Sequence, residues 1–256
     1  MTMNETEERV AGILLQLERR GSERNRAGMA RYAITAPKVF GVPAKRLHEI
    51  ATRLGTDHPL ALLLWETGWH EARILAALVD DPARVTGQQM ERWARDFDNW
   101  AICDTCCMRL FDRTPHAWWK AEVWGKRRAE FVKRAGFALV ASLARKDRAS
   151  PDAPFLLALR WVEREATDDR NFVRKAVNWA LRAIGERNTR LSAAARTVAA
   201  SLATSTDRTA RWIGRDALRQ FGTPASRARV ARAMQAAAKG RAPRRRARAA
   251  PRGPRR

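Results

Sequence analysis

Apolar residues recur every three to four positions along almost the whole chain, with polar residues between them. Val10, Ile13, Leu14 and Leu17 follow this spacing, which places them on one face of an α-helix. A half-buried strand would instead need apolar and polar residues in alternation, and such alternation is nearly absent. The pattern therefore predicts an all-α protein.

Turn residues divide the chain into separate helices. Gly21 ends the first helix, and a further pattern opens at Pro43 and closes at Gly55, the order that helix ends favour. Other helices are expected to begin after side chains that can accept from the free amides of a helix N-terminus. These residues are Asp57, Thr86, Asp98, Thr114, Asp152, Asp169, Ser205 and Thr223.

Three segments repeat a common pattern. Phe131 opens F-V-K-R-A, Phe172 opens F-V-R-K-A-V-N-W-A-L-R-A-I-G and Thr209 opens T-A-R-W-I-G-R-D-A-L-R-Q-F-G, at offsets of 41 and 37 residues. Units of about 40 residues with two helices are typical of HEAT and armadillo repeats, whose stacking turns one row of helices into a concave surface. We therefore predict a HEAT-like helical repeat solenoid.

Basic residues outnumber acidic ones, 50 against 27, for a net charge of +23. A basic fold favours a polyanionic partner such as nucleic acid, so the predicted concave groove is expected to be basic. Residues 239–256 hold nine basic and no acidic residues, which leaves +14 for the rest. We expect one domain at 1–238 and a disordered tail at 239–256, which either attracts phosphates nonspecifically or has no specific role.

Targeting segments and disulfides are not expected. The first residues lack a basic flank followed by an apolar run, so they do not read as a secretory signal. The longest apolar run, Leu60 to Trp65, is far below the ~20 residues that a bilayer span needs. Cys103, Cys106 and Cys107 form an odd, clustered set that makes a poor disulfide framework. We expect a soluble protein of the cytoplasm, associated with the nucleoid.

The segment F-D-N-W-A-I-C-D, which ends at Asp104, is the strongest candidate for chemistry. Trp100 and Asp104 lie four residues apart and hence one turn apart on one helix face. Cys107 and Phe111 continue this face, so Asp104 interrupts an apolar stripe. Because desolvating a carboxylate costs free energy, the interruption suggests a function.

An alternative interpretation leaves Asp104 at the border of the stripe, facing water above a core of Cys103, Cys106 and Leu110. The same cysteines form a C-x-x-C, which in other contexts binds zinc or performs redox chemistry. No second cysteine pair exists, no two histidines have ligand spacing, and the motif lies inside a predicted helix. We therefore expect buried cysteines beneath the Asp104 helix and no metal site.

Five segments occur in an order shared with a known family. They are M-A-R-Y at Met29, V-F-G-V-P at Val39, N-W-A-I-C-D at Asn99, F-V-K-R-A at Phe131 and F-V-R-K-A-V-N-W-A-L-R at Phe172. Together they resemble successive motifs of the AlkD-like DNA glycosylases, which remove alkylated bases from DNA. The resemblance covers roughly residues 20 to 185.

The resemblance implies roles for individual residues. Asp104 would be the catalytic carboxylate. Trp100 and Trp179 would pack against the sugar and backbone of the damaged nucleotide. Arg134 would be the cationic residue of the groove, and Tyr32 would face the DNA.

Arg134 has apolar residues on its own helix face, so its stem is expected to be partly buried and its guanidinium to reach the groove and contact a phosphate. The alternative is an ordinary surface arginine. Lys175 occupies the corresponding position of the next repeat. The chain departs from the family at Asn99, where another tryptophan would be familiar, and in a longer stretch between Arg134 and Trp179. Both departures bear on the shape of the groove.

The chemistry of an alkylated base supports the same function. A purine alkylated at N3 or N7 is positively charged, so it can leave without a general acid. The barrier then requires stabilisation of an oxocarbenium-like sugar and a positioned water, both of which an ionised carboxylate near C1′ can supply. Trp100 and Trp179 suit a cationic transition state because indole faces attract cations.

The resulting hypothesis is a monomeric DNA glycosylase that excises N3- or N7-alkylated purines from duplex DNA without metal or cofactor. The resemblance further implies that the base stays stacked and that no deep base pocket is needed. Two other functions fit the pattern: a noncatalytic helical-repeat protein that binds nucleic acid, and a HEAT-type scaffold that recruits an acidic protein. Base release separates the first alternative from the enzyme, and the salt dependence of DNA binding separates the second.

The remaining tryptophans are expected only to pack helices. They are Trp65, Trp69, Trp93, Trp118, Trp119, Trp124, Trp161 and Trp212.

Overall fold

The computed structural model describes residues 3–241. Within this range every regular element is a helix, which confirms the all-α prediction. The chain begins with α1 (Met3–Arg20) and α2 (Glu23–Arg31), and the described part ends with α14 (Pro224–Arg241). Residues 242–256, most of the tail expected at 239–256, lie outside the described residues.

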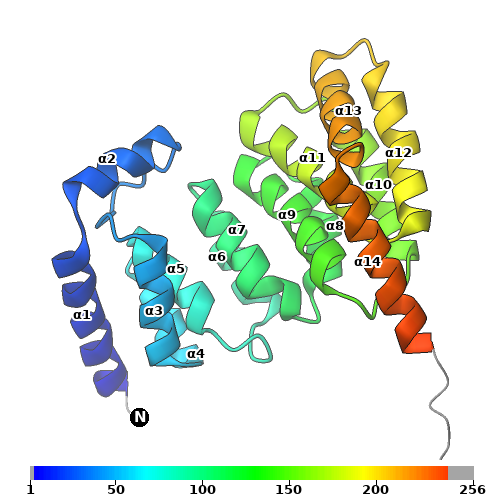
Figure 1. Ribbon diagram of the computed structural model, residues 1–256. Helices are drawn as coiled ribbons and strands as arrows, with labels where there is room; N and C mark the ends of the chain where they lie inside the picture. Colours follow the sequence, from blue (N-terminus) through cyan, green and yellow to red (C-terminus); the bar gives the residue numbers. More distant parts are fainter. Residues whose placement is uncertain (1–2, 242–256) are drawn as a thin grey trace, which may run out of the picture.

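The helices between these ends form two rows (Figure 1). The inner row consists of α3 (Ala44–Leu54), α5 (His70–Val79), α7 (Trp100–Arg109), α9 (Glu130–Lys146), α11 (Asn171–Gly185) and α13 (Arg208–Phe221). The outer row consists of α4 (His58–Glu66), α6 (Gly87–Arg95), α8 (Ala117–Gly125), α10 (Ala153–Glu165) and α12 (Thr189–Ala203), with a short 3-10 helix η1 (Phe111–Arg113) after α7.

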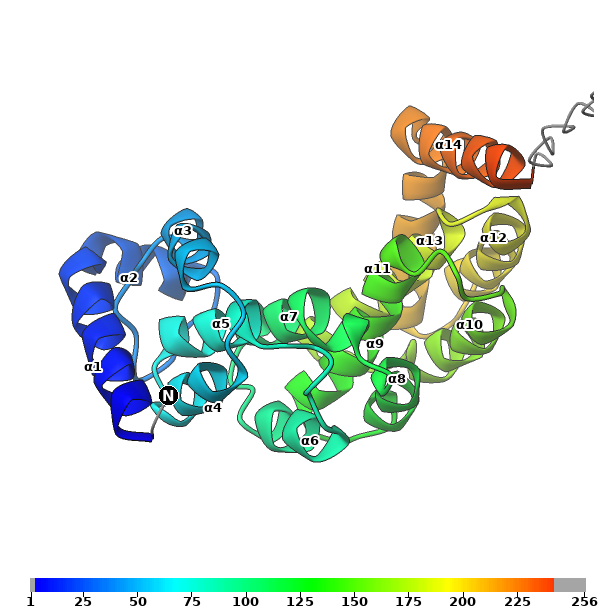
Figure 2. The same ribbon diagram turned by 90° about the horizontal axis from the view of Figure 1, so that it is seen from below.

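The two rows bend together, so that the inner row lies on the concave side of the molecule (Figure 2). Each inner helix packs against the next inner helix, as stacked HEAT-like repeats require. The predicted solenoid is thus confirmed.

The repeat positions coincide in space. Phe131 opens α9 and Phe172 opens α11, and their rings lie 5.2 Å apart. Inner and outer helices also approach closely at Gly136 of α9, where a Cβ would lie only 2.5 Å from the backbone nitrogen of Gly125 in α8. This contact requires glycine, because any side chain would push the two rows apart.

Helix ends follow the expected chemistry in most places. Gly21 follows α1, Pro43 precedes α3, and Gly55 closes α3 with a φ of 72°. Asp57 and Thr86 cap α4 and α6 by accepting from backbone amides. The other predicted starts lie within two residues of the observed helix starts, whereas the starts of α2, α5, α9 and α12 were not predicted.

A continuous apolar core fills the space between the rows. Trp65 and Trp93 stack in it with ring centroids 4.1 Å apart. Packing does not account for all eight tryptophans assigned to it, because Trp119 is 57% exposed and Trp212 is 37% exposed. The expectation that Trp119 only packs helices is therefore wrong, because most of its side chain lies exposed at the surface of α8.

The cysteines of the C-x-x-C segment are buried, as expected. Cys103, Cys106 and Cys107 are free and have no exposed surface. Burial holds the pKa of Cys106 and of Cys107 well above the usual range, so both stay protonated at neutral pH. None of the described helices is both long and apolar enough to cross a bilayer.

Candidate functional site

The segment N-W-A-I-C-D forms the start of α7, in the middle of the inner row. Asn99 is the N-cap, and its side-chain oxygen accepts from the amides of Ala101 at 3.0 Å and Ile102 at 3.2 Å. Its amide nitrogen lies 3.3 Å from Nδ1 of buried His70. Burial lowers the pKa of His70, so the ring is neutral and can accept this hydrogen bond. The asparagine at this position thus fixes where α7 begins.

Asp104 forms a bidentate ion pair with Arg134 of α9. Arg134 Nε donates to Oδ1 at 2.9 Å and Nη2 donates to Oδ2 at 2.7 Å. Arg134 Nη1 donates to the carbonyl oxygen of Phe172 in α11 at 2.9 Å. One guanidinium therefore connects three successive inner helices. The sequence did not predict this pairing, in which the guanidinium faces the carboxylate.

Arg134 is more deeply buried than Asp104. Arg134 is 7% exposed, so it is not the surface arginine of the alternative interpretation. The side chain of Asp104 keeps 16% of its surface exposed, above Cys103 and Cys106, which are in the core together with Leu110. Both interpretations of the stripe are partly correct: Asp104 lies at its border, yet it is held by a cation rather than by water alone.

Burial raises the pKa of the Asp104 carboxyl above its usual range, and the guanidinium of Arg134 acts in the opposite direction. The bidentate geometry is typical of an ionised carboxylate, whose two oxygens share the negative charge and accept equally well from the two parallel N–H groups of the guanidinium. Each carboxylate oxygen has two lone pairs, so Asp104 can accept further hydrogen bonds while it stays paired.

Trp100 lies one turn before Asp104 and connects α7 to the N-terminal segment. Its Nε1 donates to the carbonyl oxygen of Tyr32 at 2.8 Å. The side chain of Tyr32 itself is 71% exposed, just after α2. Two of the predicted site residues, 68 positions apart, are thus joined by a hydrogen bond.

Of the two predicted residues of α11, one is exposed and the other contacts the C-terminal part of α9. Lys175 is exposed. Trp179 is partly buried, and its ring centroid lies 6.0 Å from the guanidinium carbon of Arg145. Arg145 is eleven residues after Arg134, about three turns further along α9. The ring of Trp179 therefore contacts a residue well beyond the Asp104 pair.

A buried acid holds the V-F-G-V-P segment, a feature that sequence reasoning missed. Glu71 has no exposed surface, and its carboxylate accepts from three successive backbone amides: Phe40 at 3.0 Å, Gly41 at 2.7 Å and Val42 at 3.1 Å. Gly41 has a φ of 82° and its Cβ would lie 2.5 Å from the carbonyl oxygen of Ser22. The loop between α2 and α3 is thereby fastened to α5.

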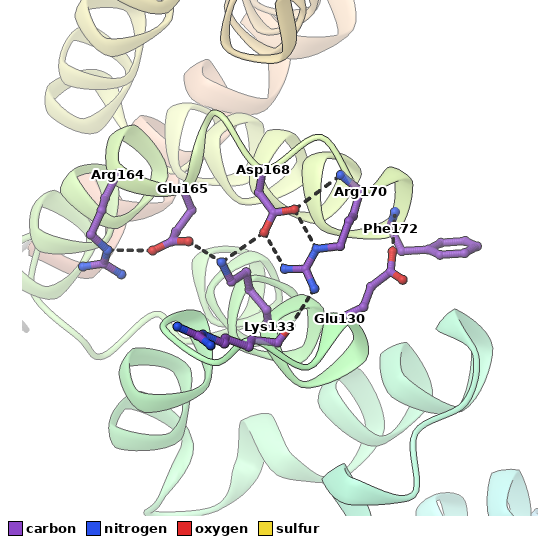
Figure 3. A network of polar contacts seen from close by, with 8 residues as sticks. Glu130, Lys133, Arg164, Glu165, Asp168, Arg170 and Phe172 are labelled. Atoms are coloured by element: carbon purple, nitrogen blue, oxygen red, sulfur yellow. Dashed lines mark hydrogen bonds and ion pairs between the residues drawn. The ribbon is translucent and has the colours of Figure 1, made fainter. Parts of the chain in front are cut away.

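A second polar network holds the start of α11 against α9 (Figure 3). Lys133 bridges Glu165 and Asp168, and Asp168 also accepts from Arg170. Arg170 in turn donates to the carbonyl oxygen of Arg128 before α9. The network fixes the turn that precedes Phe172, whose carbonyl binds Arg134, so it positions the site indirectly.

This network predicts a pH-dependent contribution to stability. Hydrogen bonds from Arg170 lower the pKa of Asp168 from 3.8 to about 2, with Lys133 acting in the same direction against burial. A group with a depressed pKa stabilises the fold above its unfolded pKa and loses this contribution as the pH falls toward the folded one. Asp168→Asn is expected to cost about 1 kcal/mol at pH 6, after allowance for screening by solvent.

The loss should shrink as the pH falls below about 4, because protonation removes the same interaction from the wild type. Urea unfolding of both proteins between pH 6 and 3 measures it. A difference that stays constant over this range would show that the charge of Asp168 does not stabilise the fold.

Among the residues with described positions, no group of three or more histidine, cysteine, aspartate or glutamate side chains could hold a metal ion.

Comparisons with known proteins identify the family and the fold. A family model described as DNA alkylation repair enzyme matches residues 13–221. Among curated proteins no match is found. A solved structure shares the fold with a TM-score of 0.68 and 21% identity over 82% of this chain and 94% of that chain; it represents a new family of proteins related to the HEAT-like repeat DNA glycosylases, with affinity for branched DNA structures. Because the family model covers most of the inner and outer rows, this chain belongs to the DNA alkylation repair enzyme family.

Proposed function

We propose that this protein is a DNA glycosylase that excises N3- or N7-alkylated purines from duplex DNA. The observation that carries the proposal is the Asp104 carboxylate, which is partly exposed on the inner row, oriented by Arg134 and adjacent to Trp100 on the same helix. Membership of the DNA alkylation repair family supports the substrate class.

The proposed reaction is hydrolysis of the bond between the purine nitrogen and C1′ of deoxyribose. The bonding electrons pass to the purine, which neutralises its positive charge and leaves as a neutral base. The oxygen of a water molecule then bonds to C1′ and releases one proton to Asp104 or solvent. Asp104 stabilises the cationic sugar and orients the water, and no metal or cofactor is required.

Other predicted residues act in this proposal as contacts to DNA. Trp100 and Trp179 pack against the deoxyribose and backbone near the lesion, where an indole face favours developing positive charge. Tyr32 and Lys175, both exposed, contact the backbone on either side. Arg134 keeps Asp104 ionised and in place, which replaces the direct phosphate contact expected for it.

The test is release of 7-methylguanine from a duplex that contains one such base, measured in a single turnover with protein in excess. The wild-type chain is expected to release the base faster than buffer alone, and binding is measured on the same duplex. Tight binding without release would refute the glycosylase proposal.

A second candidate function is noncatalytic DNA binding. Arg134 neutralises Asp104 in the resting geometry, which weakens the field that a cationic sugar would feel. The structurally similar protein is described by its affinity for branched DNA structures. In this case a four-way junction would bind at least as tightly as the alkylated duplex, and no base would be released.

Arg134→Gln is expected to shift the pH dependence of base release. Without the guanidinium the pKa of Asp104 rises further, because an adjacent opposite charge lowers a carboxyl pKa by about 1–3 units. The acid limb of the rate profile should move to higher pH by a similar amount, with activity recovering toward alkaline pH. Protein-free duplex provides the baseline at each pH.

Lys175→Gln is the matched control, because it removes a cation at the corresponding position of α11 that is exposed. It should weaken DNA binding and leave the acid limb in place. If both variants shift the profile equally, the shift reflects the overall charge and Arg134 does not set the ionisation of Asp104.

A further inference from the structure

A second basic site lies at the C-terminal ends of α9 and α11. The last turn of α9, the residues after α11 and the middle of α14 enclose a cavity of about 770 Å³. Its charged lining consists of Arg145, Arg148, Glu186, Arg187, Arg229 and Arg232.

The single carboxylate of this lining is already engaged. Glu186 accepts from Arg229 at 2.8 Å and from Gln220 at 3.2 Å, and its side chain is only 6% exposed. Arg148 and Arg232 are exposed and have no carboxylate within 4.0 Å among the described residues. The cavity therefore keeps a strong excess of positive charge.

Arg187 forms a buried wall of the cavity. It is 7% exposed, donates to the carbonyl oxygens of Ala144 at 3.3 Å and Ser150 at 2.8 Å, and lies over the ring of Phe155 at 4.1 Å. No described carboxylate lies within 4.0 Å of its guanidinium. Burial lowers the pKa of Arg187 from its usual value, and the charges of Asp147 and Asp152 act in the opposite direction.

Capping of the C-terminal end of α9 explains part of this cluster of arginines, because cations are favourable beside the last carbonyls of a helix. It accounts for Arg187, whose acceptor Ala144 lies in that last turn. It does not account for Arg232, which lies in the interior of α14 and has no described carboxylate within 4.0 Å, whereas Arg229 pairs with Glu186.

We propose that this cavity binds backbone phosphates of DNA that flanks the Asp104 site. The inference rests on DNA being the partner of this chain. A space of this size, with guanidinium groups on three separate segments, fits a stretch of sugar-phosphate backbone better than a single small anion.

The distance between the cavity and Asp104 indicates that the two sites contact different nucleotides of the DNA. Arg145 follows Arg134 by eleven residues of one helix, which corresponds to roughly 17 Å along α9. At 3.4 Å per base pair, this is about five base pairs of duplex. One nucleotide cannot occupy both places, so the cavity lies beside DNA outside the reacting nucleotide.

The test compares two double variants of the full chain that lose the same charge. Arg148→Ser with Arg232→Ser removes exposed arginines from the cavity. Arg160→Ser with Arg190→Ser removes exposed arginines from α10 and α12 of the outer row. Affinity for one undamaged 30-base-pair duplex is measured from 50 to 300 mM salt, and binding of inorganic phosphate to each protein is measured by calorimetry.

The cavity variant is expected to lower the slope of log affinity against log salt by about 1 to 2, because each lost phosphate contact removes about 0.9. The outer-row variant should change the slope by less than half of this. Equal slopes for the two variants would overturn the proposal, and so would phosphate binding that the cavity variant alone loses while its DNA slope is unchanged, since the cavity would then hold a small anion.

Base release distinguishes this proposal from the proposed function. The outer-row variant should release 7-methylguanine at the wild-type rate, whereas the cavity variant should need a higher protein concentration to reach its maximum rate. A wild type that releases no base would refute the glycosylase, while the comparison of salt slopes would still decide whether the cavity binds DNA.

Discussion

Replacement of Asp104 by asparagine is expected to slow single-turnover base release by about 10²- to 10³-fold, the usual cost of removing one group that stabilises charge in a transition state. Asparagine keeps the shape of the side chain and one acceptor for Arg134, but it carries no negative charge. Because the loss concerns the cationic sugar rather than the bound duplex, affinity for the alkylated DNA should change only a few-fold.

Stability must be separated from chemistry in this variant. Asp104→Asn leaves the guanidinium of Arg134 without its counter-ion, and breaking a buried pair costs about 3 kcal/mol. Asp112→Asn provides a matched control, because Asp112 accepts from Ser142 at 2.6 Å and Lys146 at 2.7 Å and its side chain is 1% exposed. It lies in η1, two turns beyond Asp104, and also links to α9.

The control should lower the melting temperature by a similar amount and leave the rate of base release at saturating protein unchanged. If the two asparagine variants lose base release equally, Asp104 acts through stability alone. If Asp104→Asn retains the wild-type rate, the carboxylate takes no part in the reaction and the noncatalytic alternative gains support.

The helices were predictable because their signals are local. Apolar spacing needs only neighbouring residues, and capping side chains such as Asp57 and Thr86 act within one turn. α5 and α9 follow Trp69 and Ala129, whose side chains cap nothing, so no local residue marks these starts. α12 does have a local signal, because the side chain of Asn188 accepts from the backbone amide of Leu191.

The site was predictable only in part for the same reason. Trp100 and Asp104 share one helix face, so their proximity follows from a spacing of four. The pairing of Asp104 with Arg134 depends on the register between α7 and α9, 30 residues apart in the sequence. Without the stacked fold, Arg134 could be placed on its own helix face but could not be given a partner.

The anchor of the V-F-G-V-P segment had no sequence signal at all. Glu71 lies 29 to 31 residues from the amides that it accepts from, and its position in α5 resembles that of any acid in a first helical turn. Sequence reasoning assigns such an acid to the surface, whereas the structure buries it completely.

Glu71→Ala is expected to be the most destabilising of the substitutions considered, at about 3–5 kcal/mol. It leaves the amides of Phe40, Gly41 and Val42 without acceptors, and each buried unsatisfied amide costs about 1–3 kcal/mol, partly offset where water enters the space left by the carboxylate. For a chain of this length, the melting temperature should fall by roughly 10 °C. Chemical denaturation measures the loss directly.

Glu66→Ala is the matched control, because Glu66 ends α4 nearby, is exposed and carries the same charge. It should cost less than about 0.5 kcal/mol. Hydrogen exchange of Glu71→Ala should show the largest loss of protection in the loop at 39–43 and in the helices on either side of it. A cost equal to that of Glu66→Ala would show that the three amides find other acceptors. If the loss of protection is large and confined to this loop and its neighbouring helices, and base release also slows, the loop keeps Tyr32 against Trp100 and so completes the site.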